Sequence, residues 1–385
     1  MKPLRFLMVA GESSGDMYGA DVALALRGRF PDCEIFGLGG QRMRQAGVEL
    51  EGDIRHTAAM GPLAALAQIG ALFKVFRRLV DRIETSVPDA AILIDFPDFN
   101  LRLAKRIKAA NIPIIYFISP QVWAWRASRV KQIKGLVAKM LVIFPFEEKI
   151  YKDAGVNVEF VGHPLIETVR TTKTKEKFCL AHGLDPKKPL LAILPGSRKK
   201  EIRHILPTLC EAVDLILAAK PGTQFVLPAA PNLDRELIDG IVGNRPIKVF
   251  QGDTYNALRY ARAAIVASGT ATLEAALLGT PEVIVYRISA VEAWFLGRFF
   301  LKVRLFGIVN IILGEEVVPE LFQNRFTAEL VSQAAMNLMD DVWLQSKIRG
   351  NYETLRRQLG GGKVAERVAN TVAELVSPER SQTKR

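Results

Sequence analysis

The stretch LRFLMVAGESSGD, residues 4–16, joins a short apolar run directly to a turn rich in glycine and serine. The run lacks strict alternation of apolar and polar residues, which is typical of a strand buried on both faces of a parallel sheet. A helical pattern follows from about Met17. A strand, a Gly/Ser turn and a helix in this order begin a βαβ unit, so the stretch predicts an α/β fold.

The same alternation of an apolar run with a helical pattern recurs along the chain and is interrupted once. Further apolar runs lie at 90–95, 112–119 and 138–144, and then at 190–197, 223–230, 247–252, 263–270 and 281–288. Between the two groups, the polar stretch ETVRTTKTKEKF at 167–178 loses apolar periodicity. We therefore predict two doubly wound, Rossmann-like domains that face each other across a cleft, followed by a C-terminal helical tail. Their predicted ranges are 1–168, 169–326 and 327–385.

The composition of the chain indicates which kinds of partner and which compartment to expect. The chain has 385 residues, 49% of them hydrophobic, and 52 Lys and Arg against 40 Asp and Glu, which gives a formal charge of +12. The charge favours an anionic partner such as nucleic acid, an acidic membrane or a phosphorylated substrate. The cysteines form no CxxC pair and the histidines show no zinc spacing, so we expect no metal, no cofactor and a reducing cytoplasm.

Targeting and membrane-spanning segments are not expected. The apolar run Phe6–Ala10 meets Glu12 too soon for a signal peptide. No run approaches the roughly 18 uncharged residues needed to cross a bilayer, so any membrane contact is expected to be peripheral.

Three loops of the first predicted domain carry candidate residues. The GESSGD turn could hold an anion at a helix start, or it could be an ordinary turn capped by Ser or Asp. Asp95 ends a strand and Asp98 follows three residues later, where parallel sheets bind ligands; Asp98 could instead cap the next helix. Trp123 and Trp125 could stack on a sugar or pack in the protein. Basic residues do not interleave with such aromatics on a sheet face, so nucleic-acid binding is not expected.

The second predicted domain also carries candidate residues in loops that lead into helices. LPGSRKKEI, residues 194–202, places Ser197 and Arg198 at a helix start, where a cation is unfavourable unless an anion is bound. Ser268, Gly269 and Thr270 open another helix, and Glu274 within that helix could accept hydrogen bonds from ribose hydroxyls or simply lie on its surface.

Two segments combine apolar and basic residues. Residues 60–83 place leucines, isoleucines and phenylalanines three or four apart beside Lys74, Arg77, Arg78 and Arg82, and residues 292–307 add aromatics with three further cations. Such segments can lie on anionic lipid, or their apolar stripe can face the protein core.

Taken together, these pieces resemble the lipid-A-disaccharide synthase family from residue 5 to about 375. The matching pieces, in family order, are GESSGD, IDFPDFNLRLAK, ISPQVWAWR, VGHPL, LPGSRKKEI, ASGTATLEAAL, NIILGEEVVPELFQ and LGGGKVAERVA. The resemblance implies an inverting, metal-free GT-B glycosyltransferase that joins UDP-2,3-diacylglucosamine to 2,3-diacylglucosamine 1-phosphate (lipid X) and releases UDP. The resemblance also implies that the protein works at the anionic cytoplasmic face of the inner membrane. It further implies a homodimer in which the two copies exchange C-terminal elements.

The resemblance also implies roles for the residues. Asp98 is the favoured base on the acceptor 6-hydroxyl, with Asp95 second. On the donor side, Arg198 faces the diphosphate, together with Ser197 and the helix start at Ser268, Gly269 and Thr270. Glu274 holds the ribose. Asn310 and Gln323 line the donor side of the site. Glu12, Ser13, Ser14 and Asp16 border the cleft. One departure is VNIIL at 309–313, where the family often has proline before the asparagine.

Other functions remain open at this stage. Another UDP-GlcNAc-type GT-B enzyme is the nearest alternative, either a 2-epimerase or the peptidoglycan N-acetylglucosaminyltransferase, although GESSGD is not the GGTxGH-like first loop expected of the latter. A non-catalytic module that binds nucleotide sugars or lipids is a second alternative, against which the paired Asp95 and Asp98 argue.

Overall fold

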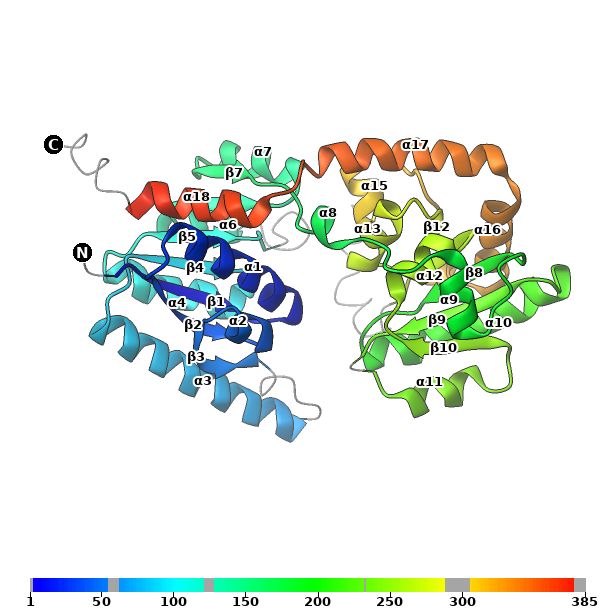
Figure 1. Cartoon of the computed structure of the whole chain (residues 1–385), viewed down its shortest axis with the longest axis horizontal. Coiled ribbons are helices and arrows are strands. Elements are labelled where there is room, and N and C mark those ends of the chain that lie inside the picture. The colour runs from blue at the N-terminus through cyan, green and yellow to red at the C-terminus, as the bar shows by residue number, and fades with distance from the viewer. Residues whose placement is uncertain (1–2, 55–61, 121–127, 232, 288–304, 377–385) are drawn as a thin grey trace. The chain divides into compact units, whose positions relative to one another are not determined.

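The computed structural model describes residues 3–54, 62–120, 128–231, 233–287 and 305–376. The chain divides into two compact units, one formed by Met1–Pro164 with Leu359–Arg385 and the other by Leu165–Gln358. The break between them therefore falls at 164/165, near the predicted 168/169. The helices predicted as a separate region at 327–385 are divided between the two units (Figure 1).

The first unit contains a seven-stranded parallel sheet in the order β3-β2-β1-β4-β5-β6-β7. The strands are β1 (Arg5–Ala10), β2 (Glu34–Gly39), β3 (Glu49–Asp53), β4 (Ala90–Ile94), β5 (Ile114–Phe117), β6 (Lys139–Val142) and β7 (Val158–Phe160). Every residue of β4 and β5 is buried. This burial explains why these strands read as continuous apolar runs rather than alternating ones.

Helices cover both faces of this sheet. They are α1 (Ser13–Arg29), α2 (Gln41–Gln45), α3 (Pro62–Thr85), α4 (Pro97–Ala109), α6 (Ser128–Leu136), α7 (Pro145–Asp153) and α18 (Val364–Val376). On one face α18 lies along α1 (Figure 1). Leu26 of α1 and Val368 of α18 pack in the same core. On the other face, the core contains Leu79 of α3 and Ile107 of α4. The unit is therefore doubly wound, as predicted.

The second unit contains a six-stranded parallel sheet in the order β10-β9-β8-β11-β12-β13. The strands are β8 (Leu190–Leu194), β9 (Gln224–Ala229), β10 (Ile247–Gln251), β11 (Ala263–Ala267), β12 (Glu282–Tyr286) and β13 (Glu320–Phe322). Numbered from its own first strand, this is the 3-2-1-4-5-6 Rossmann order.

The helices of the second unit include the first two of the three α-helices that follow β13. They are α8 (Leu165–Thr168), α9 (Lys175–His182), α10 (Lys199–Ala219), α11 (Arg235–Val242), α12 (Thr254–Tyr260), α13 (Thr270–Leu277), α15 (Ile308–Leu313), α16 (Ala328–Asp340) and α17 (Val342–Gln358). α16 contacts α10, and α17 contacts α13 and α15. Among the described residues, no helix is long and apolar enough to cross a membrane.

Each sheet has one point at which its strand order reverses. In the first unit this point lies between β1 and β4, and in the second between β8 and β11. Parallel sheets bind ligands beyond the carboxyl ends of the strands at such points. The loops that follow these four strands are therefore where a site is expected.

Candidate active site

The loops after β1 and β4 meet at the switch point of the first unit. A Cβ atom added to Gly11, just after β1, would lie 2.1 Å from Cγ of Phe96, just after β4. The phenyl ring therefore occupies the space that a side chain at residue 11 would need. Phe96 also stacks on Phe99 with ring centroids 5.3 Å apart. Glycine at position 11 thus allows the two loops to approach closely.

Asp95 stands at the carboxyl end of β4 in an unusual backbone conformation. Its φ angle is 46°, and that of Phe96 is 48°, both in the left-handed region that non-glycine residues seldom adopt. Asn100 Nδ2 and Tyr116 Oη each donate a hydrogen bond of 2.7 Å to the Asp95 carbonyl oxygen and hold the turn. Strained residues that are held this firmly concentrate at functional sites.

The Asp95 side chain is a carboxyl group that titrates close to neutrality. Its pKa is raised from 3.8 to about 6, mainly by burial and also by the negative charge of Glu12 in the loop after β1, while a hydrogen bond from the Phe96 backbone N–H opposes the shift. A carboxylate with a raised pKa is a stronger base than an ordinary aspartate.

Asp98 has a different environment from the one expected of the favoured base. It lies in the first turn of α4, where its negative charge suits the helix dipole. Its side chain is 78% exposed and forms an ion pair with Arg129 of α6. The Asp98 carboxylate is thus exposed and paired, whereas the Asp95 carboxyl group is half-buried at the switch point.

The remaining first-unit candidates separate into two groups. Glu12, Ser13 and Ser14 are exposed at the start of α1, at the same sheet edge as Asp95. Asp16 is instead buried, and its carboxylate accepts backbone hydrogen bonds from Gly40, Arg42 and Met43 at 2.7–3.1 Å. Asp16 therefore holds the start of α2 and does not border an open site. Trp123 and Trp125 lie outside the described residues.

In the second unit, the loop after β8 is organised around Glu201. Oε2 of Glu201 accepts hydrogen bonds from the backbone N–H groups of Ser197, at 2.8 Å, and Arg198, at 3.2 Å. Gly196, with φ 113°, leaves the room for this carboxylate. The backbone donors of the predicted anion cradle are thus already used, whereas the Arg198 side chain is 76% exposed at the start of α10.

The loop after β11 presents the second helix start. Gly269 and Thr270 are exposed there and Ser268 is half-buried. Within α13, Glu274 is half-buried and accepts a hydrogen bond of 3.1 Å from Tyr255 Oη on α12. Burial raises the pKa of Glu274. Glu274 is therefore held in place rather than lying free on the helix surface, and its partner Tyr255 was not identified from the sequence.

Asn310 and Gln323 have different environments. Asn310 is 0% exposed, and its amide makes four hydrogen bonds, to Val318 O, Glu320 Oε1, Val317 N and Val318 N. An Asn amide can make no more than four, so these contacts use the whole hydrogen-bonding capacity of the Asn310 amide. The predicted place of Asn310 on the donor side stays a prediction. Gln323 is half-buried with φ 49° at the carboxyl end of β13, the same sheet edge as Ser268.

The described residues contain no candidate metal site. No group of three or more His, Cys, Asp or Glu side chains lies in an arrangement that could hold a metal ion within that part of the chain.

Comparison with known proteins adds independent evidence. Residues 6–375 match the family model described as lipid-A-disaccharide synthetase. The lipid-A-disaccharide synthase of Myxococcus xanthus is 43% identical over 98% of this chain and 99% of its own length. That of Koribacter versatilis is 42% identical over 97% of this chain and 98% of its own length.

Solved structures share the fold at low sequence identity. UDP-GlcNAc 2-epimerase from Neisseria meningitidis, bound to UDP-GlcNAc, aligns with a TM-score of 0.67 at 14% identity, covering 96% of this chain and 100% of its own. The calicheamicin glycosyltransferase CalG4 aligns with a TM-score of 0.60 at 16% identity, covering 98% and 100%. The predicted fold class, α/β of the GT-B type with two Rossmann-like domains, is confirmed.

Proposed function

The chain belongs to the lipid-A-disaccharide synthetase family, and from this premise we propose how its residues carry out the reaction. It is a UDP-sugar-dependent glycosyltransferase of lipid A biosynthesis. The proposed donor is UDP-2,3-diacylglucosamine and the proposed acceptor is 2,3-diacylglucosamine 1-phosphate. The products are the β(1→6)-linked disaccharide 1-phosphate and UDP.

The observation that carries the mechanism is the Asp95 carboxyl group, half-buried at the switch point with a pKa of about 6. In its ionised form Asp95 accepts the proton of the acceptor 6-hydroxyl as that oxygen attacks the donor anomeric carbon. The bond from that carbon to the diphosphate breaks, and the electron pair leaves with UDP. A single displacement of this kind inverts the anomeric configuration. Asn100 and Tyr116 act as positioning residues through the Asp95 backbone.

On the donor side, charge and helix geometry supply the complementary binding. The exposed Arg198 guanidinium faces the diphosphate, and the α13 start at Ser268, Gly269 and Thr270 offers N–H donors to it. Glu274, held by Tyr255, accepts hydrogen bonds from the ribose hydroxyls. Ser197 and Gln323 complete the donor side. These cationic and dipolar groups neutralise the leaving diphosphate, so we propose a reaction that needs neither a metal ion nor a cofactor.

We further propose that the protein works at the cytoplasmic face of the inner membrane. The support is the outward face of α3, where Phe73 is 54% exposed beside exposed Lys74 and Arg77. Its inward residues, Leu79 and Ile83, pack in the core, so only part of the predicted apolar stripe is free to meet lipid. Residues 60, 61 and 292–304 of the two predicted lipid-binding segments lie outside the described residues.

The proposed homodimer exchanges C-terminal elements between copies. α18 follows α17 of the second unit in sequence but packs on α1 of the first unit. An exchange of α18 between two copies would keep this packing unchanged.

Incubation with both acylated substrates tests the function directly. Mass analysis of the lipid products should show the disaccharide 1-phosphate, with one UDP released for each disaccharide formed. Release of UDP without a disaccharide, or free acylated glucosamine as the product, would contradict the proposal.

A further inference from the structure

Two helices of the second unit, α12 and α13, are joined at matching positions. Tyr255 Oη of α12 donates a hydrogen bond of 3.1 Å to Oε1 of Glu274 on α13. Arg259 Nη1 of α12 donates one, also of 3.1 Å, to the Leu278 carbonyl oxygen. The two donors are four residues apart, and so are the two acceptors, so each pair spans about one helical turn. The two hydrogen bonds therefore hold α12 and α13 in register.

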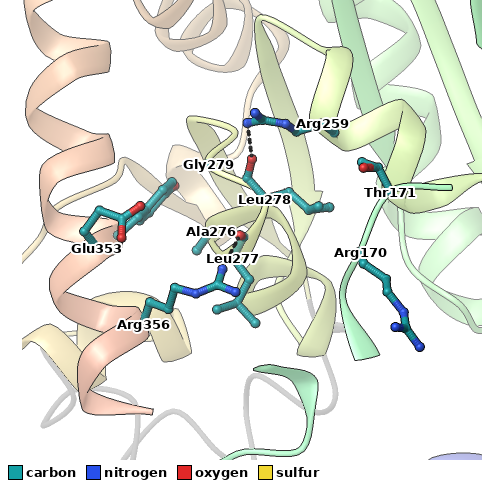
Figure 2. Close-up of a pocket in the computed structure, with 10 residues that line it drawn as sticks. Arg170, Thr171, Arg259, Ala276, Leu277, Leu278, Gly279, Glu353 and Arg356 are labelled. Atoms are coloured by element: carbon teal, nitrogen blue, oxygen red, sulfur yellow. Dashed lines mark hydrogen bonds between the residues drawn. The ribbon is translucent and has the colours of Figure 1, made fainter. Parts of the chain in front are cut away.

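The second of these bonds closes the carboxyl end of α13 (Figure 2). Leu278 directly follows the helix, where carbonyl groups have no partner within the helix and carry a partial negative charge. Arg259 satisfies the Leu278 carbonyl, and Arg356 of α17 donates to the Leu277 carbonyl at 3.2 Å. Figure 2 shows both bonds. The arginines at this end of α13 thus fix the helix.

The helix α12 is itself held by hydrogen bonds on Asn256, which is 2% exposed. Asn256 Oδ1 accepts from the backbone N–H groups of Thr172, at 3.1 Å, and Lys173, at 3.2 Å. Its Nδ2 donates to Thr172 Oγ1 at 3.0 Å and to Asp253 Oδ1 at 2.9 Å. These four bonds use the whole capacity of the amide. α12 is therefore a fixed support against which α13 is held.

The position of α13 matters because this helix carries two parts of the proposed donor site. Its start at Ser268, Gly269 and Thr270 offers N–H donors to the diphosphate, and Glu274 accepts hydrogen bonds from the ribose. α13 has eight residues, and a helix this short is not stable by itself. The place of Glu274 is therefore set by the contacts of α13 with its neighbours.

We propose that Arg259 is a positioning residue for the donor: by holding the end of α13 against α12, it keeps the Glu274 carboxylate where the ribose hydroxyls bind. The inference rests on the proposed role of Glu274. Arg259 acts through Glu274 and not by contact with the donor, because its hydrogen bond lies one turn beyond Glu274, toward the end of α13 that is opposite the Ser268 to Thr270 start.

Calorimetry of UDP binding to wild type, Arg259→Gln, Glu274→Ala and the double variant tests the inference. Arg259→Gln removes the bond to the Leu278 carbonyl. UDP affinity should fall roughly two- to fivefold, less than for loss of the ribose contact itself, because Arg356 still holds α13. In the Glu274→Ala background, Arg259→Gln should cause no further loss, since the contact that Arg259 positions is already absent.

Arg245→Gln is the matched control. Arg245 Nη1 donates at 3.3 Å to the Val242 carbonyl at the end of α11, a helix that carries none of the proposed donor residues. Its UDP affinity should equal that of the wild type. Arg259→Lys keeps a cationic donor at the end of α13 and should keep most of the affinity. Thermal unfolding of each variant checks that it is folded.

Two results would overturn the inference and leave the role of Glu274 intact. One is a UDP affinity of Arg259→Gln equal to that of the wild type. The other is a loss of the same size in the Glu274→Ala background, which would show that Arg259 acts elsewhere. If Glu274→Ala alone binds UDP as tightly as the wild type, the proposed ribose contact fails, and the inference fails with it.

Discussion

Glu12 and Asp95 come from loops after adjacent strands of the first sheet, and the charge of Glu12 contributes to raising the pKa of Asp95 to about 6. The parallel pairing of β1 with β4 brings the two carboxyl groups to the same sheet edge, although they are far apart in sequence. The negative charge of Glu12 disfavours the ionised form of Asp95, so the Asp95 carboxylate is a stronger base than an ordinary aspartate.

The first prediction concerns pH. The ionised form of Asp95 is the active base, so kcat/KM should rise with pH and reach half its maximum near pH 6. Glu12→Gln removes the negative charge that helps to raise the pKa, so the midpoint should move to lower pH. A pH–rate profile of both proteins measures this. An unchanged midpoint in Glu12→Gln would contradict electrostatic coupling between the two groups.

The second prediction separates the two aspartates. Asp95→Asn keeps the shape of the side chain but cannot accept a proton, so kcat should fall by roughly 100- to 10,000-fold. UDP affinity, measured by calorimetry, should stay near that of the wild type. Asp98→Asn removes the charge that pairs with Arg129 in an exposed ion pair and should lose no more than a few-fold in kcat. The reverse order of the two variants would make Asp98 the base.

The third prediction concerns stability. The pKa of Asp95 is higher in the folded protein than in the unfolded chain, so the folded state binds its proton more tightly. The stability from this effect is complete below pH 4 and is lost as pH rises through 6. Asp95→Asn avoids the burial of a charge and should be more stable than the wild type by about 1–3 kcal/mol at pH 7.5.

Chemical denaturation at two pH values checks this third prediction. The difference in the free energy of unfolding should shrink between pH 7.5 and pH 4. A variant that is less stable than the wild type at pH 7.5 would show that the Asp95 carboxylate has favourable contacts that outweigh the cost of its burial.

The fourth prediction concerns the ribose contact. Glu274→Ala removes the proposed acceptor and should weaken UDP binding by about 1–3 kcal/mol. Tyr255→Phe removes only the hydroxyl that holds Glu274, at 3.1 Å, and should have a smaller effect in the same direction. Calorimetry with UDP measures both variants. Equal UDP affinity in Glu274→Ala and the wild type would place the ribose contact elsewhere.

The fifth prediction concerns the membrane. Each basic side chain near an anionic bilayer adds about 1 kcal/mol of binding, so replacing both Lys74 and Arg77 by Gln should release the protein from anionic vesicles at low salt. Replacing Lys187 and Lys188 by Gln is the control, because these exposed residues precede β8 in the second unit. Vesicle flotation compares the variants, and equal loss in both would indicate an effect of net charge alone.

Much of the fold followed from sequence. Runs such as AAILI at 90–94 are apolar throughout because both faces of a central parallel strand are covered by helices. The break in the rhythm near 167–178 marked the passage to a second unit, and Gly/Ser loops after strands marked the ligand-binding edge. The division of α16, α17 and α18 between the two units did not follow from the sequence. The surface on which an amphipathic helix packs depends on residues far away in sequence.

The individual roles of the site residues depended on tertiary contacts. Asp16, Asn310 and Asp98 are polar residues in loops or first turns, and their pattern suits either a ligand or a structural hydrogen bond. Only the folded chain showed that Asp16 and Asn310 are bonded to backbone groups and that Asp98 pairs with Arg129. Tyr255 and Tyr116 could not be linked to Glu274 and Asp95 beforehand, since 19 and 21 residues separate the partners.

The sequence by itself determined the α/β class, the two doubly wound units and the position of the candidate loops after the strands, because strand burial and turn composition are local properties of the chain. Tertiary structure alone distinguished the environment of Asp95 from that of Asp98. The pKa of Asp95 depends on burial and on the charge of Glu12, which the pairing of β1 with β4 brings near. The ion pair of Asp98 forms only when α6 brings Arg129 to α4.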